Sequence, residues 1–139
     1  MTNEVQILKG GSHEDQRGII CFNNDFDLSL IKRAYTITNH SIEFIRGWQG
    51  HKIESRWFAS MKGEFEIMVI KLLDFDNPDS AEEIQKFLLS DNSLSFLHVP
   101  HGHITAIRAC NQDNKLLVLA DYNLNEIQDE YRFDLNTFL

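Results

Sequence analysis

The sequence predicts an all-β protein whose antiparallel strands form a sandwich or a barrel. Short runs of β-branched, aromatic and other apolar residues recur along the chain, and polar turn residues separate them. The two prolines and seven glycines are scattered as turn residues, without an internal repeat or a linker. A length of 139 residues suits one domain with one core. We therefore expect a single domain over residues 1–139.

The first half of the chain carries clear strand signals. Runs rich in β-forming residues cover residues 19–22, 31–38, 56–61 and 65–73. Lys62-Gly63-Glu64 separates the last two runs and predicts a tight hairpin. The polar segment 74–80, which contains Pro78, is expected to be a loop.

The second half continues the same pattern with one ambiguous segment. Residues 81–89 fit either one turn of helix or another strand, and their length favours the strand. Further strands are expected at 95–99, 104–109 and 115–120, of which the last is the most apolar and should be a central strand. The tail, residues 125–139, mixes charges with aromatic residues, and we expect it to pack across the barrel or against a partner subunit.

Composition and charge exclude several function classes. A net charge of −8 argues against a nucleic-acid partner, because binding to a phosphate backbone needs a basic face. No apolar run approaches the ~18 residues that span a bilayer, and we expect a cytoplasmic protein without a membrane partner. The two cysteines, Cys21 and Cys110, allow one bridge or two thiols, and two buried thiols are the favoured alternative.

The most informative stretch is residues 46–58, which combines three cations with an imidazole, an amide and two indoles. In the wall of a barrel, alternate side chains of such a strand face the interior. One parity holds Arg46, Trp48, Gly50, Lys52, Glu54 and Arg56, and the other holds Gln49 and His51. A bulge at Gly47 or Gly50 would shift this parity. The stretch predicts the site and leaves open which set points inward.

The spacing of this stretch resembles the metal-binding motifs of cupin barrels, although most ligands are missing. Those motifs are His-x-His, a following acid and Gly, and Pro-x-Gly-x-x-His on a later strand. Here Gln49-x-His51 stands in the place of His-x-His, and Arg56 replaces the acid. Thr105 replaces the final histidine of the Pro-x-Gly-x-x-His motif, which begins at Pro100. A cation at the acid's position repels a divalent metal, so we expect no metal and no cofactor.

Other residue types in the chain have two interpretations each. Arginines and lysines near this stretch fit bidentate recognition of phosphate oxygens, or they form salt bridges with glutamates on a strand surface. Trp48 and Trp57 are expected in the core, with stacking on a base as the alternative. His98, His101 and His103 are expected to be solvated or to cap the turn around Pro100.

Four motifs in order resemble the dTDP-sugar 3,4-ketoisomerases, which are related in fold to the dTDP-4-dehydrorhamnose 3,5-epimerases. The motifs are Asp15-Gln16-Arg17-Gly18, Ile31-Lys32-Arg33-Ala34-Tyr35, Arg46-Gly47-Trp48-Gln49-Gly50-His51-Lys52 and Val118-Leu119-Ala120-Asp121-Tyr122. The resemblance covers residues 15–138. It implies a homodimeric, metal-free cupin jelly roll that binds a nucleotide-diphospho-4-keto-6-deoxysugar and serves bacterial surface-glycan biosynthesis.

The resemblance also implies roles for single residues. In that family an Arg-Gly-x-His-x-His-Lys run supplies histidines that move a proton between C3 and C4 of the sugar through an enediol. The second histidine is His51 here, and Gln49 replaces the first. Arg56 is in line with a lysine that stabilises the enolate in the epimerases. The residues implied in substrate binding are Arg17, Arg33, Tyr35, Arg46, Lys52 and Tyr122.

Two functions of different classes follow. The leading hypothesis is an isomerase or epimerase of a nucleotide-linked keto-deoxysugar, with His51 as general base and acid and with Gln49 and Arg56 at the oxyanion. The alternative is a non-catalytic nucleotide-sugar binding cupin, because the amide of Gln49 cannot take a proton near neutral pH. A purely structural barrel is disfavoured, because an interior lined by cations without a ligand would cost stability.

Overall fold

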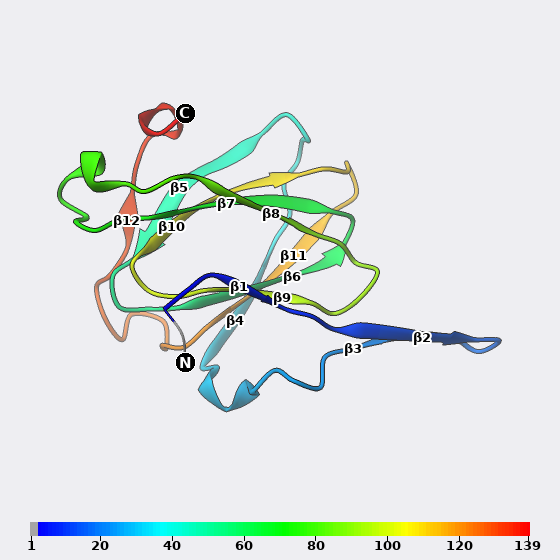
Figure 1. The fold of residues 1–139 in the computed structure, drawn as a ribbon. Helices are drawn as coiled ribbons and strands as arrows, with labels where there is room; N and C mark the ends of the chain where they lie inside the picture. Colours follow the sequence, from blue (N-terminus) through cyan, green and yellow to red (C-terminus); the bar gives the residue numbers. More distant parts are fainter. Residues whose placement is uncertain (1–2) are drawn as a thin grey trace.

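The computed structural model describes residues 3–139 as two antiparallel five-stranded sheets packed face to face, with a separate two-stranded hairpin (Figure 1). The first sheet has the order β1-β9-β6-β11-β4, with β1 (Gln6–Leu8), β9 (Phe96–Val99), β6 (Arg56–Lys62), β11 (Lys115–Ala120) and β4 (Arg33–Ile37). The second has the order β12-β5-β10-β7-β8, with β12 (Tyr131–Arg132), β5 (Ile45–His51), β10 (His103–Ala109), β7 (Phe65–Lys71) and β8 (Gln85–Leu89). The hairpin joins β2 (Gly11–Asp15) to β3 (Gly18–Phe22). The predicted all-β antiparallel class is confirmed.

Most predicted elements are present, with differences at their ends. The ambiguous segment 81–89 forms strand β8, and β11 is an interior strand, as predicted, although β6 occupies the centre of that sheet. The expected loop at 74–80 contains a short 3-10 helix, Pro78–Ser80, because the Asn77 side chain accepts from the backbone N–H of Asp79 and caps it. Two more 3-10 helices lie at Leu28–Leu30 and Leu135–Thr137.

The main core lies between the two sheets and is apolar over most of its length. Its members come from both sheets because successive strand residues point to opposite faces. They are Phe58, Phe65, Ile67, Val69, Leu89, Leu97, Val99, Ile107, Ala109, Leu116 and Val118. This cluster is the main source of stability, since burying such a side chain contributes about 1.5–3 kcal/mol.

The outer face of each sheet is covered by chain segments that centre on a tryptophan. Trp48 projects outward from β5, its ring lies edge-on to Phe138 with centroids 5.6 Å apart, and its indole N–H donates to the Leu135 carbonyl at 3.1 Å. The tail therefore packs across the second sheet, which is one of its two expected positions. Trp57 packs on the outer face of the first sheet with Phe26 and Phe96. Both indoles belong to the core, as predicted.

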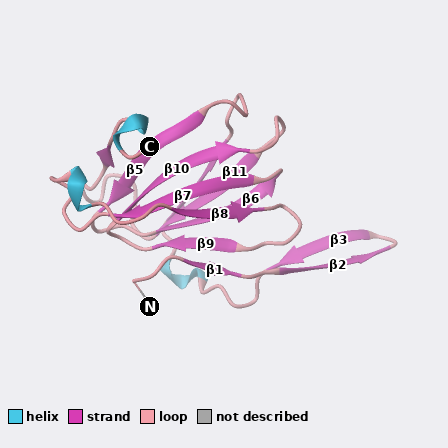
Figure 2. Ribbon diagram, turned by 45° about the horizontal axis from the view of Figure 1, so that its top comes forward, coloured by secondary structure: helices cyan, strands magenta, loops and turns pink. Residues whose placement is uncertain are grey.

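The β2–β3 hairpin projects away from the body of the protein (Figure 2). Its strands carry the exposed apolar side chains Ile19 and Ile20, which are 62% and 60% exposed. Both cysteines are free thiols, but Cys21 is exposed because it lies on this hairpin and Cys110 is only half-buried, so the expectation of two buried thiols is wrong. Within residues 3–139, no helix has the length and apolar character needed to cross a membrane.

Candidate active site

A bulge in β5 decides which side chains face the interior. Thr105 of β10 is opposite Gln49, but Ile107 is opposite Arg46, so the two residues Gly47 and Trp48 stand against Ala106 alone. The extra residue places Arg46 on the same side of the sheet as Gln49, while Trp48 points outward. The bulge lies at Gly47, one of the two glycines at which the sequence allowed a bulge. It brings Arg46 and Gln49, which have opposite parity in the sequence, to the same face of the sheet.

Gly50 allows β5 and β10 to approach closely at the next position. A Cβ atom on this residue would lie 2.1 Å from the His103 carbonyl oxygen and 2.7 Å from the Ile104 Cα. Backbone atoms cannot move aside as a flexible side chain does, so a side chain at position 50 would push the strands apart. The glycine therefore keeps His51 and His103, which are cross-strand partners, next to each other.

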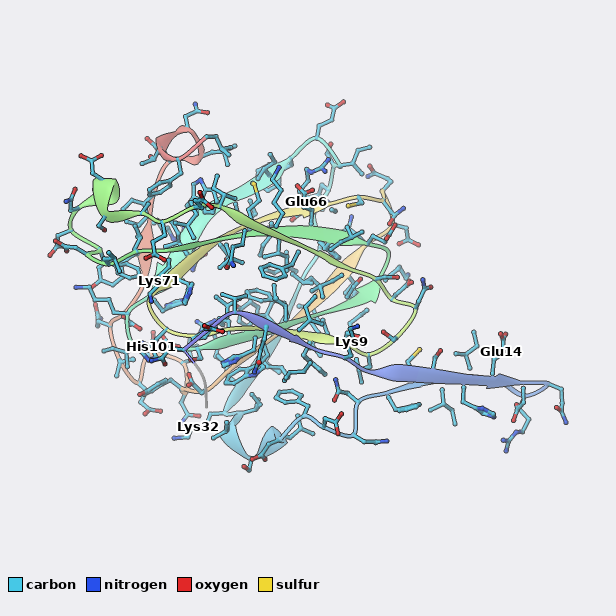
Figure 3. The ribbon with its side chains drawn as sticks, viewed as in Figure 1. Lys9, Glu14, Lys32, Glu66, Lys71 and His101 are labelled. Atoms are coloured by element: carbon cyan, nitrogen blue, oxygen red, sulfur yellow. The ribbon has the colours of Figure 1, made fainter. Side chains whose placement is uncertain are left out.

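A pocket opens between the sheets at the end where β5 and β7 finish and β10 begins. Figure 3 shows this end at the left, near the labelled Lys71 and His101. The pocket encloses about 500 Å³, open solvent included. Its polar lining consists of Tyr35, Arg46, Gln49, His51, Glu54, Arg56, His103 and Thr105. All four positions that match the cupin ligand motifs thus line one pocket.

His51 is buried at the pocket wall with its orientation fixed. Its Nδ1 lies 2.8 Å from the Asp129 carbonyl oxygen and 3.6 Å from a carboxylate oxygen of Glu54. Since a carbonyl only accepts, Nδ1 carries the proton of the neutral imidazole and Nε2 keeps its lone pair. Burial, and then the positive charge of Arg56, lowers the pKa of His51. The residue is therefore a neutral base near pH 7.

Asp129 shapes the turn that follows His51. Its buried carboxylate accepts three backbone N–H groups, from Lys52 at 2.9 Å, Ile53 at 2.7 Å and Glu54 at 2.8 Å. The same residue therefore fixes the turn with its side chain and the His51 imidazole with its carbonyl. Sequence reasoning missed Asp129, because no local pattern links it to a strand almost eighty residues earlier.

Arg56 is the buried cation of the site, and one of its donors has no partner. Its Nη1 is 3.0 Å from a Glu54 carboxylate oxygen and 3.3 Å from the Ser55 carbonyl oxygen. Its Nε is fully buried and makes no hydrogen bond. Buried donors are nearly always paired, so this unpaired guanidinium N–H is an unusual feature of the pocket wall.

The acidic groups near His51 form an ion-pair network more readily than a metal site. One ligand atom each from His51, Glu54 and Asp129 lies within 4.8 Å of the others. However, the Asp129 carboxylate already accepts three N–H groups and Glu54 pairs with Arg56. A divalent ion would have to displace these bonds beside a fixed positive charge. The donor set does not fit a resident metal.

Four further predicted residues stand at or near the pocket. Tyr35 and Arg46 belong to the pocket lining. Arg33 lines a second pocket that shares His51, Glu54 and Arg56 with the first, and its guanidinium lies 4.6 Å from the centre of the Tyr35 ring. Gln49 lines the wall and donates from its amide to the Glu130 carboxylate. The structure thus brings Gln49, His51, Arg56, Tyr35, Arg46 and Arg33 together.

The other three predicted residues lie outside this group. Arg17 is exposed in the turn of the β2–β3 hairpin, where it pairs with Asp15 at 2.7 Å. Lys52 is exposed, and its ammonium group lies 5.1 Å from the centre of the Tyr131 ring. Tyr122 is half-buried and is not among the residues that line the pocket.

The three histidines around Pro100 differ from one another. His101 is exposed, as expected, but His98 is buried on the outer face of β9 and stacks on Trp57 with ring centroids 4.7 Å apart, so it is not solvated. His103 caps the turn, with its Nδ1 3.0 Å from the Pro100 carbonyl oxygen, and it also lines the pocket. The period-2 alternation of His103, Thr105 and Ile107 is the sequence signal that identifies His103 as an inward residue.

Solved structures share this architecture. A variant of the 3,4-ketoisomerase QdtA from Thermoanaerobacterium thermosaccharolyticum, in complex with TDP-4-keto-6-deoxyglucose, is 25% identical with a TM-score of 0.71, over 96% of this chain and 90% of that one. A 3,4-ketoisomerase from Helicobacter canadensis is 26% identical with a TM-score of 0.67, over 90% of each chain. The dTDP-4-dehydrorhamnose 3,5-epimerase from Bacillus anthracis shares the fold, with 18% identity and a TM-score of 0.74, over 98% of this chain and 83% of that one. The predicted cupin-type jelly roll is confirmed.

Sequence comparison places the chain in one family. None of the curated proteins matches it. The family model described as FdtA: WxcM-like, C-terminal matches residues 3–139, which is nearly the whole chain and includes every residue of the pocket. The resemblance to the 3,4-ketoisomerases is thereby confirmed, and the chain belongs to the FdtA family, WxcM-like, C-terminal.

Proposed function

We propose that this chain is a 3,4-ketoisomerase that acts on a TDP-linked 4-keto-6-deoxysugar without a metal or a cofactor, in bacterial surface-glycan biosynthesis. The observation that carries the proposal is the pairing of a neutral, oriented His51 with a buried Arg56 whose Nε has no partner, in one pocket. Solved relatives of 25–26% identity are 3,4-ketoisomerases, which favours this reaction over 3,5-epimerisation.

The reaction needs a base that can return the proton it takes. Moving the keto group from C4 to C3 transfers one hydrogen from C3 to C4 and one from O3 to O4, so the composition of the sugar does not change. The Nε2 lone pair of His51 removes the C3 proton and the imidazolium delivers it to C4. Glu54, 3.6 Å from Nδ1, offsets the positive charge that His51 carries between these steps.

Negative charge develops on O4 when the C3 proton leaves. Arg56 offers its unpaired Nε–H and its positive charge to this oxygen. Gln49 lies on the same wall and offers its amide as a second donor. Fixed donors of this kind stabilise an enolate because they need no reorganisation during the reaction.

The diphosphate of the substrate requires cations beside the reacting groups. Arg33 in the second pocket and the exposed Arg46 supply two guanidinium groups, although the chain as a whole carries a charge of −8. Arg17 lies in the turn between β2 and β3. Figure 3 shows this hairpin, on which Glu14 is labelled, extending away from the body of the protein, so Arg17 reaches a substrate only in the pocket of a second copy. This position, together with the exposed Ile19 and Ile20, supports a homodimer formed through the hairpin.

The test is turnover of TDP-4-keto-6-deoxyglucose in D₂O, followed by NMR. We expect the 3-keto sugar to form and deuterium to enter the carbon skeleton, with no loss of rate in the presence of a chelator. Binding is measured by thermal shift with TDP, UDP, GDP and phosphate, since a ligand of the native state raises its melting temperature. A shift with TDP but neither product nor deuterium in the sugar would identify the alternative, a non-catalytic nucleotide-sugar binding protein, which the replacement of a histidine by Gln49 favours.

Dimerisation is tested separately by light scattering on the purified protein. We expect a dimer for the natural chain and a monomer for Ile20→Asp, because a charge on an apolar contact surface costs free energy of association. A monomeric natural chain with full turnover would overturn the dimer and leave the assignment of the pocket intact.

A further inference from the structure

A second buried histidine stands beside His51 on the inner face of the second sheet. His103 of β10 is the register partner of His51 on β5 and of Lys71 on β7. Cross-strand partners have Cβ atoms about 4.5–5.5 Å apart, so the two imidazoles border the same part of the pocket. Both residues line the pocket, and both are less than 10% exposed.

The two imidazoles are held in the same way by different parts of the chain. The Nδ1 of His103 lies 3.0 Å from the Pro100 carbonyl oxygen and 3.2 Å from that of His101, whereas Nδ1 of His51 faces the Asp129 carbonyl. A carbonyl only accepts, so each Nδ1 carries its proton and each Nε2 is left with a lone pair. Burial lowers the pKa of both side chains, and Lys71 and His101 act in the same direction on His103. Both groups therefore start as neutral bases.

The proposed reaction has a second proton transfer that Gln49 cannot perform. An amide neither gives nor takes a proton near neutral pH, and the transfer between O3 and O4 needs a group that does both. We propose that His103 is the second proton-transfer residue of this site and performs the role that Gln49 cannot. This inference rests on the proposed function.

The steps balance with both histidines returned to their starting state. His51 takes the C3 proton, the C3–H electron pair forms the C3=C4 bond, and the carbonyl π pair moves to O4 as the enolate. His103 then takes the O3 proton while O3 forms the new carbonyl, and the C3=C4 pair takes the proton of His51 at C4. The protonated His103 finally gives its proton to O4.

The two roles predict different behaviour of matched variants in D₂O. In His51→Asn we expect neither product nor deuterium at C3, because the first proton transfer is lost. In His103→Asn we expect product formation to fall by about 10²–10⁴-fold, while deuterium still enters C3 of the unreacted substrate through reversible enolate formation. His101→Asn is the control, since it changes an exposed imidazole of the same turn, and it should react like the natural chain.

A thermal shift with TDP first establishes that each variant is folded. His103→Gln, which keeps a polar group of similar reach, is measured in the same way if His103→Asn is not folded. Product formation by a folded His103 variant at the rate of His101→Asn would overturn the inference and leave the proposed function intact. Loss of C3 exchange together with product would overturn the division of roles. A natural chain that gives neither product nor exchange would instead overturn the proposed function.

Discussion

The inner face of the sandwich has a polar end and an apolar end, and single strands run through both. Strand β10 begins with His103 and Thr105 at the pocket and continues inward with Ile107 and Ala109 in the core. Strand β7 runs in the opposite direction, from Phe65 in the core to Lys71 near the pocket. Both ends use the same period-2 geometry, so the difference lies only in which side chains occupy the inward positions.

This contrast shows how the fold separates stability from chemistry. Buried charges such as Arg56 and Glu54 contribute little net stability, because desolvation opposes their attraction. The apolar end, whose members Ile67, Leu116 and Val118 are fully buried, supplies the stabilisation that permits an unpaired donor at the other end. Substitutions at the two ends should therefore have effects of different kinds.

The largest effect is expected at the polar end. His51→Asn should lower kcat by about 10²–10⁴-fold, because the amide removes the base and keeps a similar volume. The free energy of unfolding should change by less than about 1 kcal/mol, which urea denaturation measures. Full turnover by this variant would remove the proposed base and the distinction between the two ends.

A core truncation tests the apolar end. Ile67→Ala should lower the free energy of unfolding by about 2–5 kcal/mol, since Ile67 is fully buried between Phe87 and Ile107 and its loss leaves a cavity. The KM of the folded fraction should stay unchanged. Leu73→Ala is the matched control because Leu73 is 68% exposed, and equal losses of stability in both variants would contradict the contrast.

His98, on the outer face of the first sheet, makes the free energy of unfolding depend on pH without belonging to the polar or the apolar end of the inner face. Burial lowers the pKa of His98 from 6.5 to about 4, so the unfolded chain binds a proton that the folded chain excludes. Stability is then fully present above pH 6.5 and falls as the pH drops toward 4, by on the order of 3 kcal/mol. His98→Leu should reduce this loss without changing turnover at pH 7. Urea denaturation at several pH values measures it, and an unchanged acid slope would rule out His98 as its source.

The smallest effect is expected for a surface ion pair near the apolar end of the sandwich. Lys62 lies 3.5 Å from Asp113, and both side chains are more than half exposed. Lys62→Ala should change the free energy of unfolding by less than about 0.5 kcal/mol, because solvent screens such pairs. A loss as large as that of Ile67→Ala would show that surface charge, rather than the apolar core, stabilises this end.

The strands and much of the site could be predicted from the sequence because both depend on local patterns. The β-rich run at residues 65–73 and the apolar run at 115–120 predict strands, and the spacing of Gln49, His51, Arg56 and Thr105 follows a motif with fixed positions on a barrel. The four motif residues meet in one pocket because the alternation of side chains along each strand and the pairing of the strands fix which face each residue occupies.

The remaining features depend on contacts between distant segments. Asp129 fixes the turn after His51 from 75–77 residues away, which no local pattern encodes. His103 joins the pocket only through its register with β5, and His98 is buried because Trp57 covers it. Arg17 matches a family motif, yet the hairpin carries it away from the pocket of its own chain.

The bulge in β5 also limits how this gene can change during evolution. The residue before it, Arg46, and the residue after it, Gln49, face the pocket only because one extra position lies between them. Deleting one codon from this strand would turn every residue on one side of the deletion to the opposite face of the sheet. A residue that now faces the pocket would then take the outward position of Trp48 against the tail. Point substitutions in β5, unlike deletions, keep Arg46 and Gln49 on the pocket side of the sheet.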